Sequence, residues 1–163
     1  MSTVAESHFE QAIADWLVTH GGYQHVKFGN QPVAQRDFDP LLGVDWTELE
    51  TFIGATQRAA WNELVERHGG DQEGAQKKFK QRLAKELDAH GTVDVLRRGV
   101  TDLGILIRVA DFIPASGLNP QLMERYNANR LTVVRQFAYE ADSSKTIDLA
   151  LLVNGLLVAT VEL

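Results

Sequence analysis

The sequence contains no cysteine, which excludes disulfide bonds and thiolate metal sites and is typical of cytoplasmic proteins. It has no apolar run close to the ~20 residues that cross a bilayer, so we expect no membrane contact. Its first residues lack the basic segment and apolar core of a signal peptide. A glycine-rich phosphate-binding loop and an HExxH zinc motif are missing as well, so the chain should bind no ATP itself.

An excess of basic residues is also missing, because the 163 residues carry a formal net charge of −6. Proteins that bind nucleic acid usually present a basic surface to the phosphates. If this chain acts on DNA, we expect another domain or subunit to hold the duplex. Acidic residues lie on both sides of the basic stretch from Lys77 to Lys85 (Glu73, Glu86 and Asp88), which favours a solvated helix face. The sequence leaves open whether the arginines between Arg97 and Arg135 converge.

Apolar spacing predicts helices mostly before residue 100 and strands mostly after it, which indicates an α/β fold. The first helix carries a predicted stripe of Phe9, Ile13, Trp16, Leu17 and His20 and ends at Gly21-Gly22. Further helices are expected at about 45–69, 71–91 and 92–98 and near 121–126. Strands are expected at 103–109, 131–139, 146–153 and 156–163, with one short strand near 32–36.

Two carboxylates flank a strong hairpin signal, Asn154-Gly155, near the end of the sequence. Asp148 lies in the apolar run before the turn, and Glu162 lies in the apolar run after it. A carboxylate in such a setting is costly unless it is paired or bound to a cation. The two residues are therefore candidates for one shared site.

The register of the hairpin decides whether these carboxylates can cooperate. A two-residue turn would place Asp148 opposite Val161 and leave Glu162 on the other face of the sheet. A three-residue loop, or any other shift by one residue, would put both acids on the same face. We predict the three-residue loop or an equivalent shift, with Gly155 in the left-handed conformation. Two such carboxylates would suit Mg²⁺, which prefers hard oxygen ligands.

The segment from Thr146 to Leu163 resembles the PD-(D/E)xK nuclease superfamily, whose motif is Asp, a hairpin and then Glu-x-Lys. Asp148 and Glu162 match this motif, and its lysine would be residue 164. More specifically, the chain is similar to the N-terminal nuclease region of type I restriction enzyme R subunits. The other segments that carry this resemblance are Glu6–Glu10, Gly22-Tyr23, Arg98–Gly104, Asn119-Pro120 and Asn129–Gln136.

The resemblance implies one nuclease domain over residues 1–163, incomplete at its C-terminus, with a helical insertion at about 45–98. Its fold would be a restriction-endonuclease-like mixed sheet with the first helix packed on it. The implied reaction is Mg²⁺-dependent hydrolysis of phosphodiester bonds in double-stranded DNA. The implied partners are the methylation and specificity subunits of a type I complex and an ATP-driven motor in the full-length subunit. Without the lysine, the chain as given should be inactive or nearly so.

In the superfamily, a glutamate of the first helix often completes the metal site, and Glu6 is the candidate. A helical wheel places Glu6 inside the apolar stripe and Glu10 nearer its edge. The alternative for Glu6 is a capping box with Thr3. Gln136 is a further candidate catalytic residue, although a polar position at the sheet edge explains it equally well.

Two other functions remain open at this stage. One is a non-catalytic interaction module with a nuclease-like shape, which the acidic charge and the missing lysine favour. The other is a stand-alone nuclease of the same superfamily without a motor.

Overall fold

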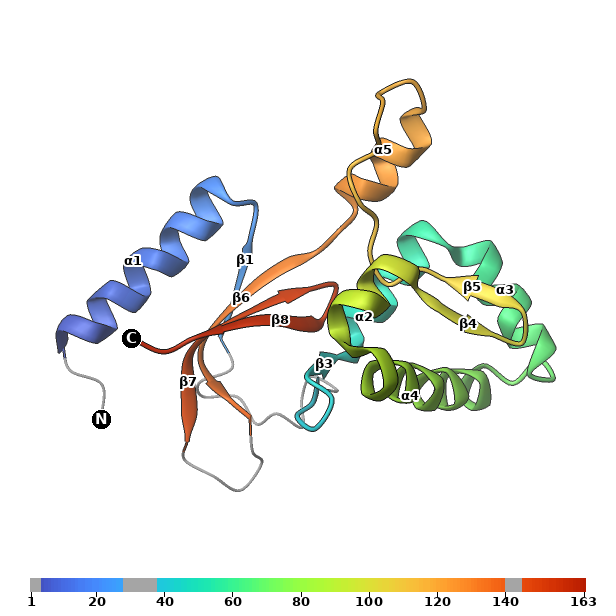
Figure 1. Ribbon diagram of the computed structural model, residues 1–163, viewed down its shortest axis with the longest axis horizontal. Helices are drawn as coiled ribbons and strands as arrows, with labels where there is room; N and C mark the ends of the chain where they lie inside the picture. The colour runs from blue at the N-terminus through green and yellow to red at the C-terminus, as the bar shows by residue number, and fades with distance from the viewer. Residues whose placement is uncertain (1–3, 28–37, 140–144) are drawn as a thin grey trace. The chain divides into compact units, whose positions relative to one another are not determined.

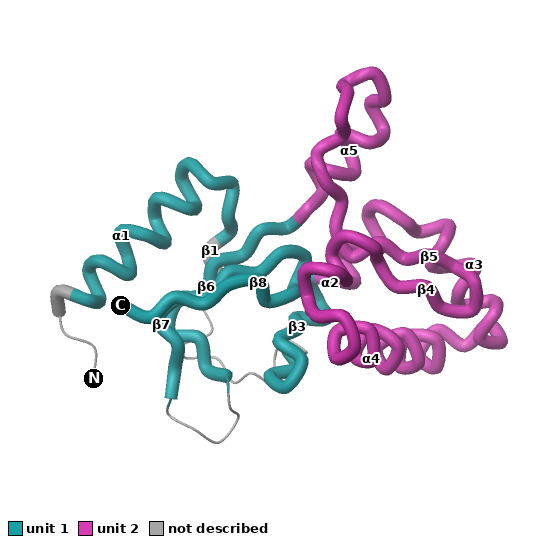
Figure 2. Tube along the Cα trace, in the orientation of Figure 1, with its two compact units in different colours: residues 1–48, 130–163 teal, residues 49–129 magenta. Residues whose placement is uncertain are grey.

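The computed structural model describes residues 4–27, 38–139 and 145–163 (Figure 1). The chain forms two compact units (Figure 2). Unit 1 comprises residues 1–48 and 130–163, and unit 2 comprises residues 49–129. Unit 2 is thus inserted between two separate segments of unit 1. The helical insertion at about 45–98 stays a prediction, and unit 2 itself spans residues 49–129.

Unit 1 is built on a six-stranded mixed sheet, which confirms the expected α/β class. The strand order is β1-β6-β7-β8-β3-β2, in which β1 runs parallel to β6 and the other neighbours are antiparallel. The strands span Gln24–Lys27 (β1), Phe38–Asp39 (β2), Val44–Asp45 (β3), Leu131–Ala138 (β6), Thr146–Val153 (β7) and Leu156–Val161 (β8). The strand predicted near 32–36 falls outside the described residues.

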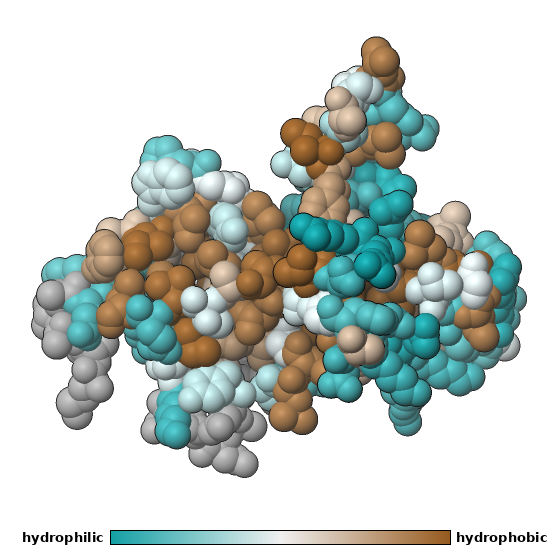
Figure 3. Space-filling model, in the orientation of Figure 1, coloured by the Kyte–Doolittle hydropathy of each residue, from teal (hydrophilic) through white to brown (hydrophobic). Residues whose placement is uncertain are grey.

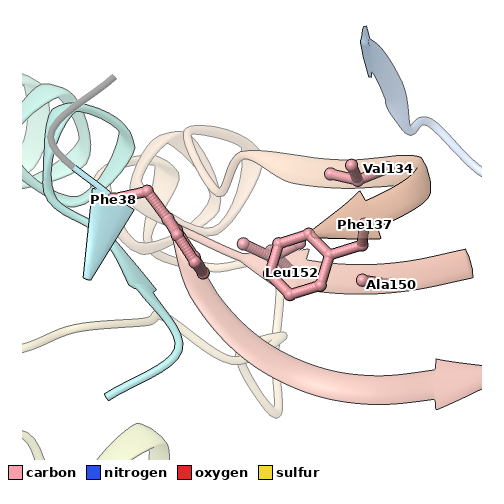
Figure 4. Packing of buried hydrophobic residues seen from close by; sticks show 5 residues of the cluster. All are labelled: Phe38, Val134, Phe137, Ala150 and Leu152. Atoms are coloured by element: carbon pink, nitrogen blue, oxygen red, sulfur yellow. The ribbon is translucent and has the colours of Figure 1, made fainter. Parts of the chain in front are cut away.

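Both faces of this sheet are covered by apolar contacts. On one face, Ala14 of helix α1 (Val4–His20) packs with Val133 and Leu149, which confirms that the first helix lies on the sheet. On the other face, Phe38 packs edge-on against Phe137, with a distance of 5.0 Å between ring centroids. Figure 4 shows this second cluster, which also contains Val134, Ala150 and Leu152.

The buried stripe predicted for the first helix is partly wrong. Phe9 and Trp16 are 59% and 60% exposed, whereas Ala14 and Glu10 are 0% and 2% exposed. Small Ala14 lets α1 approach the sheet closely, and an arginine of β6 compensates the charge of Glu10. Hydrophobic spacing alone could not reveal this rotation of the helix.

Unit 2 contains most of the helices and a small hairpin. Its elements are α2 (Trp46–Thr56, which begins in unit 1), α3 (Arg58–Arg67), α4 (Gln72–Arg98), β4 (Val100–Asp102), β5 (Ile105–Ile107) and α5 (Pro120–Asn127). Glycine at position 91 has non-helical dihedral angles and interrupts α4, where the sequence predicted one helix to end and another to begin. Within the described residues, no helix is both long and apolar enough to span a bilayer.

Two predictions for unit 2 are corrected. The helix expected at 45–69 is divided at Gln57, whose side-chain amide donates to the carbonyl of Arg108 (2.8 Å) and accepts from its N–H (2.7 Å). The strand expected at 103–109 is instead part of the β4–β5 hairpin, which turns at Leu103 and Gly104. Both of these residues have positive φ, as a tight hairpin turn requires.

Candidate active site

The β7–β8 hairpin turns through two residues, so the predicted three-residue loop is wrong. Asn154 and Gly155 have φ values of 49° and 82°, and Val153 pairs directly with Leu156. The fully buried Asn154 accepts a hydrogen bond from the N–H of Arg130 (2.7 Å) and donates its own N–H to the Arg130 carbonyl (2.8 Å). These contacts fix the turn to the start of β6.

A β-bulge supplies the shift that the loop does not. Leu152 pairs with Leu157 but Leu151 pairs with Ala159, so Val158 is an extra residue in β8. The predicted one-residue shift of register is therefore confirmed beyond the bulge. The last pair of the ladder joins Leu149 to Val161, and one further step in the same register would place Glu162 opposite Asp148.

The end of β8 also contacts Asp148 directly. The backbone N–H of Leu163 donates to the Oδ2 atom of Asp148 at 2.7 Å. Asp148 is half-buried, whereas Glu162 is exposed. The residue that follows Glu162 is thus held at the carboxylate of the first predicted ligand.

Strand β6 is distorted at Gln136. Its φ is 50°, and the ladder pairs Arg135 and Phe137 with β7 but leaves out Gln136, which lies opposite Asp148. Val134 and Phe137 share one apolar cluster although residues three apart in a regular strand face opposite sides. The alternation of side chains is therefore interrupted at Gln136.

This distortion lets two consecutive residues of β6 reach the same carboxylate on α1. The Nε atom of Arg135 donates to Oε1 of Glu10 (2.8 Å), and Nε2 of Gln136 donates to Oε2 of Glu10 (3.0 Å). Arg135 also donates to the side chain of Gln11 and to the carbonyl of Ser7 (3.4 Å). Arg135 therefore fastens α1 to the sheet and provides the positive charge that a buried glutamate needs.

The amide of Gln136 joins Glu10 to Asp148. Its Nε2 atom also donates to Oδ1 of Asp148 (3.3 Å), and its Oε1 atom accepts from the hydroxyl of Thr146 (2.8 Å). Ionised carboxylates only accept hydrogen bonds, so the NH₂ group must face both acids. An N–H dipole thus lies where two acids from different elements come closest to one another.

The structure brings Asp148 and Gln136 together, whereas Glu162 follows the last paired residue of β8, Val161. Glu6 is half-buried one turn before Glu10 on α1, and Thr3 of its predicted capping box lies outside the described residues. Sequence reasoning missed Glu10. The sequence does contain one indication of Glu10: it lies beside the apolar stripe of the first helix, and the predicted strand at 131–139 contains an arginine that could pair with it.

A divalent cation fits the chemistry of this donor set. Asp148 and Glu10 offer hard carboxylate oxygens, and one amide dipole already bridges them. Across the described ranges, no three acidic or histidine side chains are close enough together to form a complete metal cluster. The protein would therefore supply one or two carboxylates, and water and phosphate oxygens would complete the coordination, as is usual for Mg²⁺.

Four of the arginines between Arg97 and Arg135 each pair with a separate acid of their own unit. These pairs are Arg98–Asp94, Arg125–Asp111, Arg130–Glu48 and Arg135–Glu10. The hydrogen bond to Glu48 raises the pKa of Arg130, although burial acts in the opposite direction. Lys77, Lys78 and Lys85 are exposed on α4, whose surface is largely hydrophilic in Figure 3. This arrangement agrees with the solvated helix face predicted for that stretch.

Comparison with known proteins gives one match. A family model described as the type I restriction enzyme R protein N terminus matches residues 4–163. No protein of curated function and no solved structure matches the chain. The family match covers both units and every residue of the site described above.

Proposed function

Because this chain belongs to the family of the type I restriction enzyme R protein N terminus, we propose that unit 1 carries an Mg²⁺-dependent nuclease centre that hydrolyses phosphodiester bonds in double-stranded DNA. Family membership supports a nuclease domain of a restriction system. One structural observation supports the residue roles: the bulge at Val158 shifts the register by one residue, so that Leu149 pairs with Val161. Continued by one step, this register would place Glu162 opposite Asp148. Without that shift, the two acids of the motif would face opposite sides of the sheet.

In this proposal, Asp148 and Glu162 hold the metal and Glu10 is the third acid. Glu6, which the sequence favoured, stays an alternative one turn away, but the contacts to Gln136 favour Glu10. A bound Mg²⁺ would polarise the phosphodiester and lower the pKa of a bound water. Arg135 keeps Glu10 in place on α1.

The family also suggests the setting in which this centre works. We propose that the full subunit carries an ATP-driven motor and assembles with methylation and specificity subunits in the cytoplasm. The net charge of −6 supports this division of labour, because a domain of that charge needs other parts to hold the DNA. The arginines that pair with their own carboxylates support it too.

Metal binding is the measurement that isolates the carboxylates. Cleavage also depends on the lysine of the motif, which stabilises developing negative charge, whereas binding does not. Mn²⁺ titration followed by electron paramagnetic resonance should show one site in the wild type. Asp148→Asn should weaken that site by about tenfold or more, which corresponds to about 1.4 kcal/mol.

The matched control is Asp88→Asn, which removes an exposed carboxylate from α4 in unit 2. It should leave the Mn²⁺ affinity unchanged, and circular dichroism should show that both variants are folded. Equal affinity in the wild type, Asp148→Asn and Asp88→Asn would contradict the nuclease centre. That result would favour the interaction module.

A further inference from the structure

The amide group of Gln136 makes the contacts that a cation would make. It donates to Glu10 at 3.0 Å and to Asp148 at 3.3 Å, and these acids come from α1 and β7. Two carboxylates that approach one another repel unless something positive lies between them. The partial positive charge of the NH₂ group fills that role here.

The backbone at this position is strained to make those contacts. Gln136 has a φ of 50° in the middle of β6, a conformation that residues other than glycine seldom adopt. Such strain persists only where the surroundings enforce it, and it concentrates at functional sites. The hydroxyl of Thr146 holds the other end of the amide at 2.8 Å. The orientation of the amide is therefore fixed from both ends.

We propose that Gln136 is a positioning residue whose amide occupies the place of the divalent cation between Glu10 and Asp148 until the cation displaces it. This inference rests on the proposed nuclease centre and deepens it. In the metal-free protein, the amide holds both carboxylates in position through its two N–H···O bonds. The carboxylates of Glu10 and Asp148 would hold the cation, and its binding would then cost the two N–H···O bonds to the amide.

The proposal predicts the sign of a substitution. Gln136→Met keeps the length of the side chain but removes both N–H donors. Because hydrogen bonds to charged groups are strong, their absence should make cation binding about tenfold tighter. A residue that supplied its own carbonyl oxygen to the metal would give the opposite result, since its removal would weaken binding.

The experiment compares the full chain and its Gln136→Met variant by Mn²⁺ titration with Mg²⁺ competition. Gln76→Met is the matched control, because the Gln76 amide also donates to a carboxylate, that of Glu50, in unit 2. It should not change the affinity. In EDTA, Gln136→Met should melt at a lower temperature than the wild type. Saturating Mg²⁺ should raise the melting temperature of the variant by more than it raises that of the wild type.

The possible results separate the proposal for Gln136 from the proposed nuclease centre. Tighter binding that disappears when Asp148→Asn is added supports the placeholder, whereas weaker or unchanged binding overturns it and leaves the nuclease centre intact. If neither protein binds Mn²⁺ through Asp148, the placeholder and the nuclease centre both fail. Should Gln136→Met not fold, Thr146→Val frees the amide without removing it. That variant should tighten binding by about two- to threefold, and no change would overturn the proposal.

Discussion

Replacing Arg135 by methionine tests how the site is held together. The Arg135 guanidinium is the cationic partner of Glu10, which is only 2% exposed, at an Nε to Oε1 distance of 2.8 Å. Methionine preserves the apolar stem of the side chain but removes every donor. The variant therefore leaves a carboxylate inside the protein without its compensating charge.

The expected cost is about 3 kcal/mol in the free energy of unfolding of unit 1. Removing one partner of a buried ion pair costs about 3–5 kcal/mol. The lower end applies because Gln136 still donates to Glu10 and the Arg135 side chain is 20% exposed. Arg98→Met is the control, since the Arg98 side chain is 75% exposed and its distance to Asp94 is 3.4 Å. That surface pair should contribute no more than about 1 kcal/mol.

Urea unfolding followed by tryptophan fluorescence can report on unit 1 alone. Of the three tryptophans, Trp16 and Trp46 lie in unit 1 and Trp61 lies in unit 2, so a Trp61→Phe background removes the signal of unit 2. A double-mutant cycle with Glu10→Gln should show a coupling of about 2 kcal/mol with Arg135→Met. A loss no larger than that of Arg98→Met would refute the reasoning, because Glu10 would then not depend on its arginine.

Two further predictions concern the hairpin. Gly155→Ala should destabilise the protein by more than about 2 kcal/mol, because φ is 82° and the new Cβ would lie 2.1 Å from the carbonyl oxygen of Asp45. Gly54→Ala in α2 is the control, because a Cβ there meets no atom within 4 Å, and it should stabilise the protein by up to about 1 kcal/mol. If both alanine variants melted at the temperature of the wild type, both predictions would be contradicted. Deleting Val158 should remove the bulge and turn Glu162 to the other face of the sheet. The deletion variant should then bind Mn²⁺ as weakly as Glu162→Gln does. An affinity equal to that of the wild type would contradict the register argument.

The strands of unit 1 could be predicted closely because their signals are local. The run from Thr146 to Val153 is rich in branched residues and is bounded by turn residues, and β7 has the same limits. The Asn154-Gly155 pair marked the hairpin correctly, since both residues adopt positive φ in the turn. The resemblance to the type I restriction R subunit, carried by the same segment, is confirmed by the family match.

Features that depend on distant contacts could not be predicted in this way. The break between α2 and α3 depends on the pairing of the Gln57 side chain with the backbone of Arg108, 51 residues away. The apolar spacing continues through that break, so the pattern predicted one helix. The bulge at Val158 has no local marker in the sequence either, because valine favours a regular strand as much as any residue around it.

The choice between Glu6 and Glu10 shows what the helical wheel assumes. A wheel places the apolar stripe inside, and Glu10 lies at the edge of that stripe. In the structure, Arg135 contacts Glu10 across 125 positions of sequence, whereas Phe9 and Trp16 are exposed. Burying an ionised carboxylate is expensive, and a well-packed apolar residue of similar volume often stabilises a protein as well or better. The buried Glu10 is therefore what the proposed metal site would require, and the distortion at Gln136, which brings a second donor to the same carboxylate, is consistent with that proposal.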